Sequence, residues 1–269
     1  MTRIAFLGLG AMGSRMAANL SASGFDVTGW NRSPKVGLPL RVTSELSEAV
    51  RGAEIVVAMV TDDAASETVW TEALAAMKPG ALAVESSTVS PRRMAGFAAE
   101  AEAAGVAPLA APVAGSRPQA EAGELLFLTG GDADDAARFA PAVDAMGKAA
   151  IHAGTPAQAA SLKLMINGLL AIQTAAMGEI LKFGESAGFD AAGAVDLLAP
   201  VPVTSPAAAF VGKQIAAGQH DPMFTIELMA KDLGYLTKGA DMPVLSEVLA
   251  SFARAQNAGK GSLHISAVA

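Results

Sequence analysis

A few polar side chains in one long apolar segment are the first candidates for chemistry. Lys163, Asn167 and Thr174 interrupt the apolar run from Pro156 to Phe183, at intervals of four and seven residues. That spacing places all three on one side of a helix. A lysine there could donate a proton to a carbonyl oxygen as hydride arrives at the carbon, and Asn167 could orient the lysine or the substrate. On spacing alone, a lysine whose ammonium group reaches water near a helix start is an equally good interpretation.

A glycine-rich loop near the start of the chain could bind a phosphate-bearing cofactor. The apolar run 4–7 is followed by Gly8, Leu9, Gly10, Ala11, Met12 and Gly13, and then by a helical pattern. Gly8 permits the tight turn, Gly10 lets the backbone approach a pyrophosphate, and Gly13 lets the helix pack close to the strand. The free amides and the dipole of the helix start favour the anion. The strand, loop and helix together predict a dinucleotide site.

The residues after the second predicted strand indicate which dinucleotide binds. A site for NAD has an acidic residue here, which binds the ribose 2′-hydroxyl. This chain has Asn31, Arg32 and Ser33 instead, with Lys35 just beyond. Arg32 could pair with a 2′-phosphate, and Asn31 and Ser33 could donate hydrogen bonds to it. The sequence therefore favours NADP(H) over NAD, although an ordinary polar turn would have the same composition.

Alternating apolar runs and helical stretches must position these residues. Strands are predicted at 4–7, 26–30, 55–60, 82–84, 106–111 and 125–129, and helices at 12–23, 64–77, 91–104 and 134–146. Continuous apolar strands separated by helices predict a parallel sheet covered on both faces. Ser90 before Pro91 and Asp132 before Asp134 are typical helix starts. Asp62 and Asp63 stand where the helix 64–77 needs its cap, so capping is a better interpretation than a pair of catalytic carboxylates.

The pattern changes after residue 154, because no further β-rich run follows. Thr155, Pro156 and Gln158 form the signature of a capping box, so a helix should begin there and run to about Ala187. The proline-rich stretch 200–206 divides the remainder into further helices. The predicted fold class is therefore α/β. We expect an NADP-binding Rossmann domain with a doubly wound parallel sheet at 1–154, and an all-α domain for substrate binding and oligomerisation at 155–269.

Composition excludes several classes of function. The 269 residues carry 19 basic and 26 acidic side chains, a net charge of −7, which argues against nucleic acid as a partner. There is no cysteine, and the three histidines lack the spacing of a metal site, so we expect no metal. Charged residues interrupt the apolar stretch 162–183, which favours a buried helix over a membrane span. The first apolar run is too short for a signal peptide, so the expected compartment is the cytoplasm.

Several motifs, taken in order, resemble those of one family. They are the glycine loop with Asn19-Leu20, Asn31-Arg32-Ser33, the stretch Ser87 to Pro91, the stretch Ala111 to Ser116, Lys163 with Asn167, Phe224, and Lys231-Asp232-Leu233. Together they cover essentially the whole chain. The chain resembles the β-hydroxyacid dehydrogenases, which include 3-hydroxyisobutyrate dehydrogenase, and is nearest to the glyoxylate/succinic semialdehyde reductase branch.

The resemblance assigns roles to individual residues. It implies that Lys163 is the catalytic lysine and Asn167 its helper. It also implies cofactor contacts by Val60, Thr61, Thr88 and Lys231, with Thr88 at the nicotinamide end. The implied substrate contacts are Ser87, Gly115, Ser116 and Asp232. Members of the family associate through the C-terminal domain, and this apolar domain leads us to expect a homodimer or homotetramer.

Two departures from the family pattern bear on the site. Ala114 stands where the family usually has serine, so one hydrogen bond to a substrate carboxylate or hydroxyl is missing. The stretch 34–51 is too short for a full helix and its returning loop, so we expect a more open adenine side.

Three functions agree with these observations. The first is an NADPH-dependent reductase that interconverts a small aldehyde or keto acid and its hydroxy acid. The second is an imine reductase of the same fold, which Lys163 argues against and Ala114 permits. The third is a non-catalytic NADP-binding protein, which would be free to lose the lysine that this chain keeps.

Overall fold

The structure, a computed structural model, describes all residues 1–269 and divides into two compact units. The first unit is Met1–Lys163 and the second is Leu164–Ala269. The division falls inside one long helix, α7 (Pro156–Ser186), because Ala159 and Ala160 near its start pack in the core of the first unit. The domain boundary predicted near residue 154 stays a prediction.

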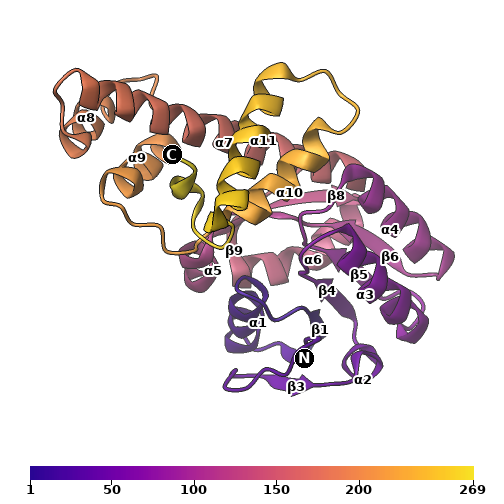
Figure 1. Cartoon of the computed structure of the whole chain (residues 1–269). Coiled ribbons are helices and arrows are strands. Elements are labelled where there is room, and N and C mark those ends of the chain that lie inside the picture. The colour runs from indigo at the N-terminus through magenta and orange to yellow at the C-terminus, as the bar shows by residue number, and fades with distance from the viewer. The chain divides into compact units, whose positions relative to one another are not determined.

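The first unit contains one sheet and six helices. The strands are β1 (Arg3–Leu7), β2 (Asp26–Trp30), β3 (Arg41–Thr43), β4 (Ile55–Ala58), β5 (Leu82–Glu85), β6 (Ala107–Ala110), β7 (Val113–Ala114), β8 (Leu125–Gly131) and β9 (Gly147–His152). The helices are α1 (Gly13–Ala22), α2 (Leu46–Val50), α3 (Asp63–Ala76), α4 (Pro91–Ala103), α5 (Arg117–Ala122) and α6 (Ala133–Met146). The strand order is β3-β2-β1-β4-β5-β6-β8-β7, with β9 paired to β8 (Figure 1).

The doubly wound parallel sheet is confirmed from β3 through β6, where every pairing is parallel. Beyond β6 the sheet is mixed, since β8 runs antiparallel to both β6 and β7. This reversal was not predicted from the sequence. A parallel crossover needs a connection long enough for a returning helix. The chain between β6 and β8 instead contains only the short β7 and the six-residue α5, and it turns back on itself.

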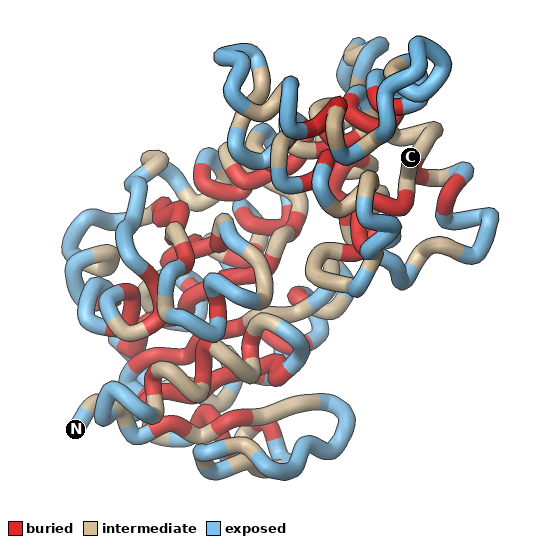
Figure 2. The backbone as a smooth tube through the Cα atoms, turned by 90° about the vertical axis from the view of Figure 1, so that its left-hand side faces the viewer, coloured by how far each residue is buried: buried red, intermediate tan, exposed pale blue.

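The sheet of the first unit is buried on both faces. Alternate residues of β1 belong to different cores: Ile4 and Phe6 pack in one, Ala5 and Leu7 in the other. The second of these cores includes Trp70, whose ring centroid lies 4.6 Å from that of a phenylalanine of α4. In Figure 2 the buried stretches of the part that holds the N-terminus lie inside it, with exposed segments around them. Burial on both faces explains why these strands read as continuous apolar runs rather than alternating ones.

The stretch 34–51 holds no full helix, as predicted, but it is not featureless. It forms the short edge strand β3 and the five-residue helix α2, both missed from sequence. Glu48 of α2 accepts a hydrogen bond from Thr43 Oγ1 at 2.6 Å and pairs with Arg41. The Thr43 hydrogen bond lowers the pKa of the Glu48 carboxyl. These contacts join α2 to the edge strand.

The second unit is helical, as predicted. After α7 come α8 (Ala191–Leu198), α9 (Pro206–Ala216), α10 (Ile226–Thr237), α11 (Pro243–Ala255), the π-helical turn η1 (Gln256–Lys260) and the 3-10 turn η2 (Ile265–Val268). The predicted capping box at the start of α7 is confirmed: Thr155 N–H donates to Gln158 Oε1 at 2.8 Å, and Gln158 N–H to Thr155 Oγ1 at 3.3 Å. By length and composition α7 could cross a membrane, but Ala171 and its neighbours form part of the core of this unit. A core helix is therefore the better interpretation.

Candidate cofactor and catalytic site

The glycines of the first loop differ in what surrounds them. A Cβ on Gly13 would lie 2.0 Å from the carbonyl oxygen of Gly8, and one on Gly8, at φ +99°, would lie 2.3 Å from that of Met59. A Cβ on Gly10 would meet no atom within 4 Å. Gly8 and Gly13 are therefore required by the fold, whereas Gly10 leaves open space where a ligand could approach the backbone. This arrangement fits the pyrophosphate of a dinucleotide at the start of α1.

The end of β2 braces this loop. Gly8 N–H donates to the Trp30 carbonyl at 2.8 Å, and Leu9 N–H donates to Asn31 Oδ1 at 2.8 Å. Asn31 Nδ2 donates to the Ser33 carbonyl at 2.8 Å. Asn31 thus joins the glycine loop to the turn after β2, a role that sequence reasoning missed. Arg32 and Ser33 are exposed at this turn, where a ribose phosphate would lie in water.

The turns after β4 and β5 are also joined. These strands are parallel neighbours, so their carboxyl ends lie at the same edge of the sheet. Ser87 is 1% exposed, and its Oγ accepts a hydrogen bond from Val60 N–H at 2.7 Å. Thr88 beside it is half-buried and Thr61 is exposed. Ser87 therefore braces Val60, and the substrate contact expected of it stays a prediction.

The predicted substrate loop leads into α5. Gly115 has φ +128°, a conformation that L side chains rarely adopt. Ser116 caps the helix, and its N–H donates to Gln119 Oε1 at 2.9 Å. The loop backbone is therefore held in one shape, with Ala114 in β7 just before it. Substrate binding by Gly115 and Ser116 stays a prediction.

The three polar residues of α7 singled out from the sequence are buried, at 8% exposure for Lys163, 3% for Asn167 and none for Thr174. Thr174 donates its hydroxyl hydrogen to the Leu170 carbonyl of its own helix at 2.8 Å. This intrahelical bond satisfies Thr174 without a ligand. Asn167 instead donates from Nδ2 to Asp232 Oδ2 of α10 at 2.6 Å. Lys163 and Asn167 lie one turn apart in the row, and their part in chemistry stays a prediction.

Lys231 and Asp232 complete a polar cluster in the second unit. Lys231 Nζ lies 2.9 Å from Asp232 Oδ1 and 5.0 Å from the ring centroid of Tyr235. The Asp232 carboxylate therefore contacts both Asn167 and Lys231. The Asn167–Asp232 contact joins residues 65 positions apart, and no local spacing could have predicted it.

Comparisons with known proteins define the class of protein. Residues 3–154 match the family described as the NAD binding domain of 6-phosphogluconate dehydrogenase. Residues 157–269 match the one described as the NAD-binding domain of NADP-dependent 3-hydroxyisobutyrate dehydrogenase. Both descriptions are of nicotinamide-dependent dehydrogenases, which agrees with the geometry of the glycine loop.

Individual relatives narrow the class. The probable 3-hydroxyisobutyrate dehydrogenase of Mycobacterium tuberculosis is 33% identical over 246 residues, covering 87% of this chain and 84% of the relative. The NAD-dependent L-serine dehydrogenase of Pseudomonas aeruginosa is 31% identical over 268 residues, covering 94% and 90%. The structure of the M. tuberculosis 3-hydroxyisobutyrate dehydrogenase with L-serine has a TM-score of 0.91 at 31% identity, covering 100% of this chain and 98% of that one. The chain belongs to the β-hydroxyacid dehydrogenase family of NAD(P)-dependent enzymes.

Proposed function

We propose that the protein is an NADPH-dependent reductase that interconverts a small aldehyde or keto acid and its hydroxy acid. The observation that carries the proposal is a lysine buried in an apolar helix, one turn from a buried asparagine that is itself anchored. Lys163 is 8% exposed, and Asn167 donates to Asp232 at 2.6 Å. Burying an ammonium group costs free energy, so a purely structural explanation is a poor one. The relatives named as a 3-hydroxyisobutyrate dehydrogenase and an L-serine dehydrogenase support the reaction class.

The side chains take distinct roles in this reaction. Lys163 donates a proton from Nζ to the carbonyl oxygen of the substrate, and takes it back in the oxidative direction. Asn167, held by Asp232, orients the lysine or the substrate. The cofactor supplies the hydride when bound. Gly115 and Ser116 would contact the acid group of the substrate, where Ala114 provides no hydroxyl.

The preference for NADPH over NADH rests on the turn after β2. Asn31, Arg32 and Ser33 present no carboxylate to repel a 2′-phosphate, and the exposed Arg32 can pair with it. The loop from Gly8 to Gly13 would hold the pyrophosphate of the cofactor. The rest of the cofactor would contact Val60, Thr61, Thr88 and Lys231. The family description of the second half names an NADP-dependent enzyme, whereas the Pseudomonas relative is named as NAD-dependent.

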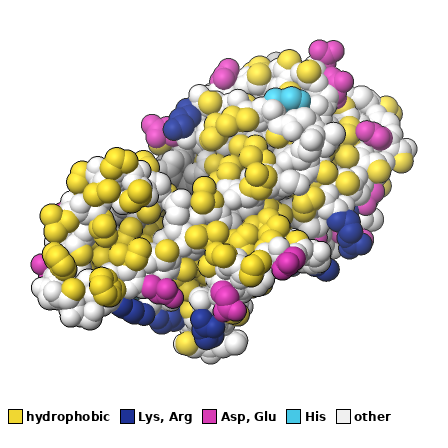
Figure 3. Space-filling model, turned by 90° about the horizontal axis from the view of Figure 1, so that it is seen from above, with side chains coloured by type: hydrophobic (Ala, Val, Ile, Leu, Met, Phe, Trp, Pro, Cys, Tyr) yellow, Lys and Arg dark blue, Asp and Glu magenta, His cyan; other side chains and the backbone are white.

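We also infer a cytoplasmic homodimer or homotetramer that associates through the second unit. Large apolar side chains are exposed along α7: Met165 at 62%, Leu169 at 59%, Ile180 at 50% and Phe183 at 74%. Figure 3 shows broad groups of hydrophobic side chains on the face in view. Apolar surface of this kind is rarely left in water and favours a second copy of the chain as its cover.

Loss of NADPH absorbance with a panel of small semialdehydes, 2-oxo acids and cyclic imines tests the function. We expect oxidation of NADPH by an acid-bearing aldehyde or a keto acid. Lys163→Ala should lower kcat about a hundredfold or more, the range expected for a general acid. Lys182→Ala removes an exposed lysine from the same helix and should leave kcat unchanged. Wild-type turnover by Lys163→Ala would rule out the mechanism.

The same panel tests the two alternatives. Turnover of cyclic imines with none of carboxylic semialdehydes would favour an imine reductase, for which Ala114 is the supporting observation because an imine needs no carboxylate partner. The imine reductase from a Pseudomonas species shares the fold at 21% identity and a TM-score of 0.67. Binding of NADPH without any turnover would favour a non-catalytic protein.

A further inference from the structure

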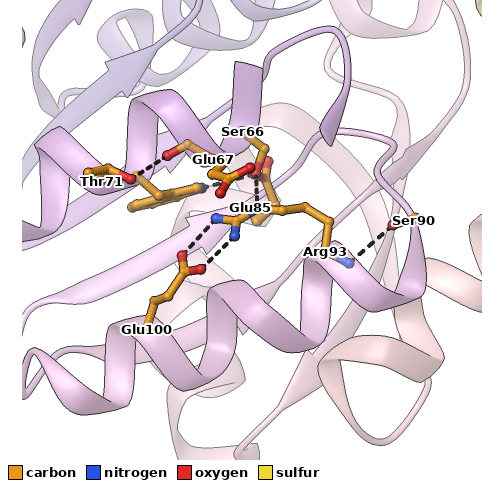
Figure 4. Close-up of polar contacts among 8 residues, drawn as sticks. Ser66, Glu67, Thr71, Glu85, Ser90, Arg93 and Glu100 are labelled. Atoms are coloured by element: carbon orange, nitrogen blue, oxygen red, sulfur yellow. Dashed lines mark hydrogen bonds and ion pairs between the residues drawn. The ribbon is translucent and has the colours of Figure 1, made fainter. Parts of the chain in front are cut away.

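A charged network lies buried behind the turn that follows β5. Glu85, the last residue of the strand, has no exposed surface. Its Oε2 accepts hydrogen bonds from Ser66 Oγ at 2.6 Å and Trp70 Nε1 at 2.9 Å, and its Oε1 accepts one from Ser87 N–H at 2.9 Å. Every partner is a donor, as an ionised carboxylate requires. Figure 4 shows Glu85 directed at Ser66 of α3.

Arg93 of α4 extends the network toward the surface. Its Nε donates to Ser66 Oγ at 3.2 Å, and its two terminal nitrogens donate to Glu100 at 2.8 and 2.9 Å (Figure 4). The surrounding core consists of aliphatic, methionine and aromatic side chains. Apolar residues of similar volume throughout the network would cost less than a buried carboxylate and its partners, even well-paired ones. The carboxylate therefore calls for a reason other than stability.

The Glu85 carboxylate contacts the turn after β5, and through it the turn after β4. Glu85 holds the turn after β5 through the backbone N–H of Ser87. The Oγ of the same serine accepts from Val60 N–H at 2.7 Å, so Glu85 orders the turns after both β4 and β5. A second carboxylate, Asp63, holds the far end of the β5 turn, accepting from Ser90 N–H at 2.8 Å and from Ser90 Oγ at 2.6 Å. Thr88 lies between these two attachments.

We propose that Glu85 is a positioning residue for the nicotinamide side of the cofactor site, acting through the backbone of Ser87. Its carboxylate fixes where Thr88 and Val60 meet the cofactor. Misplacement of a reacting group by a fraction of an ångström lowers the rate more than it lowers affinity. We expect the affinity of the cofactor to depend mainly on its pyrophosphate, at the glycine loop that follows β1. This proposal rests on the proposed function, because it takes the turns after β4 and β5 to be cofactor contacts.

Two substitutions at this position separate positioning from stability. Glu85→Gln keeps the size of the side chain but leaves one acceptor oxygen. That oxygen should face the two donors of α3, so the amide NH2 faces Ser87 N–H and the bond to the turn is lost. Glu85→Asp is one methylene shorter and no longer reaches Ser66 or Trp70. A carboxylate at this distance still accepts from the N–H two residues on, as in an Asx turn, so the bond to Ser87 is kept.

The expected results for the two variants are opposite. Glu85→Gln should lower kcat about tenfold or more while the dissociation constant of NADPH changes less than about threefold. Glu85→Asp should restore most of the lost kcat and lower the unfolding temperature instead. Trp70→Phe is the matched control: it removes a donor to Glu85 on the side away from the turn and should destabilise the protein without a change in kcat. If Glu85→Asp does not fold, Trp70→Phe still shows whether a loss of stability by itself lowers kcat.

Two further measurements do not depend on turnover. Amide hydrogen exchange between Ser86 and Ser90 in the protein without cofactor should rise about tenfold in Glu85→Gln and stay near the wild-type rate in Trp70→Phe. The fluorescence emission of bound NADPH should differ from that of the wild type in Glu85→Gln alone. If the wild type binds NADPH but reduces no substrate, the proposed function fails while these two readouts still decide the role of Glu85.

Three results would overturn the proposal. The first is a Glu85→Gln enzyme with wild-type kcat, exchange and NADPH emission. The second is a loss of kcat across all three variants in proportion to their loss of stability, which would make the network purely structural. The third is a wild-type protein that does not bind NADPH, which would remove the proposed function as well.

Discussion

At the scale of single residues, the glycine loop separates positions needed for the fold from positions needed for a ligand. A Cβ added at Gly8 or Gly13 would collide with a backbone oxygen, whereas a Cβ added at Gly10 would meet no atom within 4 Å. The GxGxxG pattern is the same in both cases, so the pattern alone cannot distinguish the two kinds of glycine. Their substitution should therefore have different consequences.

Gly10→Ala should weaken NADPH binding about tenfold or more and change the free energy of unfolding by less than about 0.5 kcal/mol. Its methyl group has no protein atom within 4 Å but would stand where the pyrophosphate approaches. Gly13→Ala should instead destabilise the first unit by about 1–3 kcal/mol, as overpacking does. Titration of NADPH fluorescence and urea unfolding measure the two effects. Equal effects of both substitutions on stability would contradict this assignment.

Arg32 should determine cofactor preference. Arg32→Ala should raise the KM for NADPH about tenfold and leave the KM for NADH unchanged, because only NADPH carries the 2′-phosphate. The exposed Arg92 of α4 provides the control, and Arg92→Ala should change neither constant. Steady-state kinetics with both cofactors makes the comparison. A parallel rise in both KM values would show that Arg32 contacts a part that the two cofactors share.

At the scale of elements, the C-terminal turn η2 depends on a buried histidine. His264 is 4% exposed, and its Nδ1 lies 3.0 Å from the Phe224 carbonyl oxygen. Its Nε2 is buried with no hydrogen-bond partner. Burial lowers the pKa of His264 below 6.5. The hydrogen bond to Phe224 raises this pKa, and the charge of nearby His220 lowers it further. The neutral imidazole is therefore the form that the folded second unit accommodates.

The stability of the protein should fall in mild acid for this reason. Above pH 6.5 His264 is neutral in both the folded and the unfolded chain, so its contribution is complete. As the pH drops below 6.5, His264 takes up a proton in the unfolded chain but stays neutral in the folded chain. The free energy of unfolding therefore falls until the pH is below the pKa of His264 in the folded chain. Urea unfolding between about pH 7.5 and 5.5 should show this loss, reduced in His264→Gln.

The exposed His152 of β9 supplies the control for this prediction. His152→Gln should keep the wild-type dependence of stability on pH. An unchanged dependence in His264→Gln would mean that other groups are responsible for the loss.

At the scale of the whole molecule, we expect the apolar exposed side of α7 to determine the state of association. We expect light scattering at micromolar concentration to give a mass at least twice the 27.0 kDa of the chain. Replacing both Leu169 and Phe183 with lysine should yield monomers, because two charges would then lie in the interface. Val36→Lys, at a position 92% exposed in the first unit, should leave the mass unchanged. A 27.0 kDa wild-type particle would contradict the inferred oligomer.

The order of the longer elements and the glycine loop could be predicted from the sequence, because both depend on neighbours along the chain. Hydrophobic runs, capping residues and glycine spacing are local signals, and they located β1, α1, α4 and the start of α7 to within a residue or two. The edge elements β3 and α2 were not predicted, because each is too short to show a periodic pattern.

Contacts between distant segments required the tertiary structure. The antiparallel course of β8 depends on which strands pair, and strand pairing leaves no mark on composition. The links from Asn31 to Leu9, from Asn167 to Asp232 and from Glu85 to α3 join residues 15 to 65 positions apart. Each consists of one or two directional hydrogen bonds, which have no periodicity and depend on how the elements pack. The sequence by itself therefore determined which residues are candidates for chemistry, and only the folded chain decided which of them are held in place and by what.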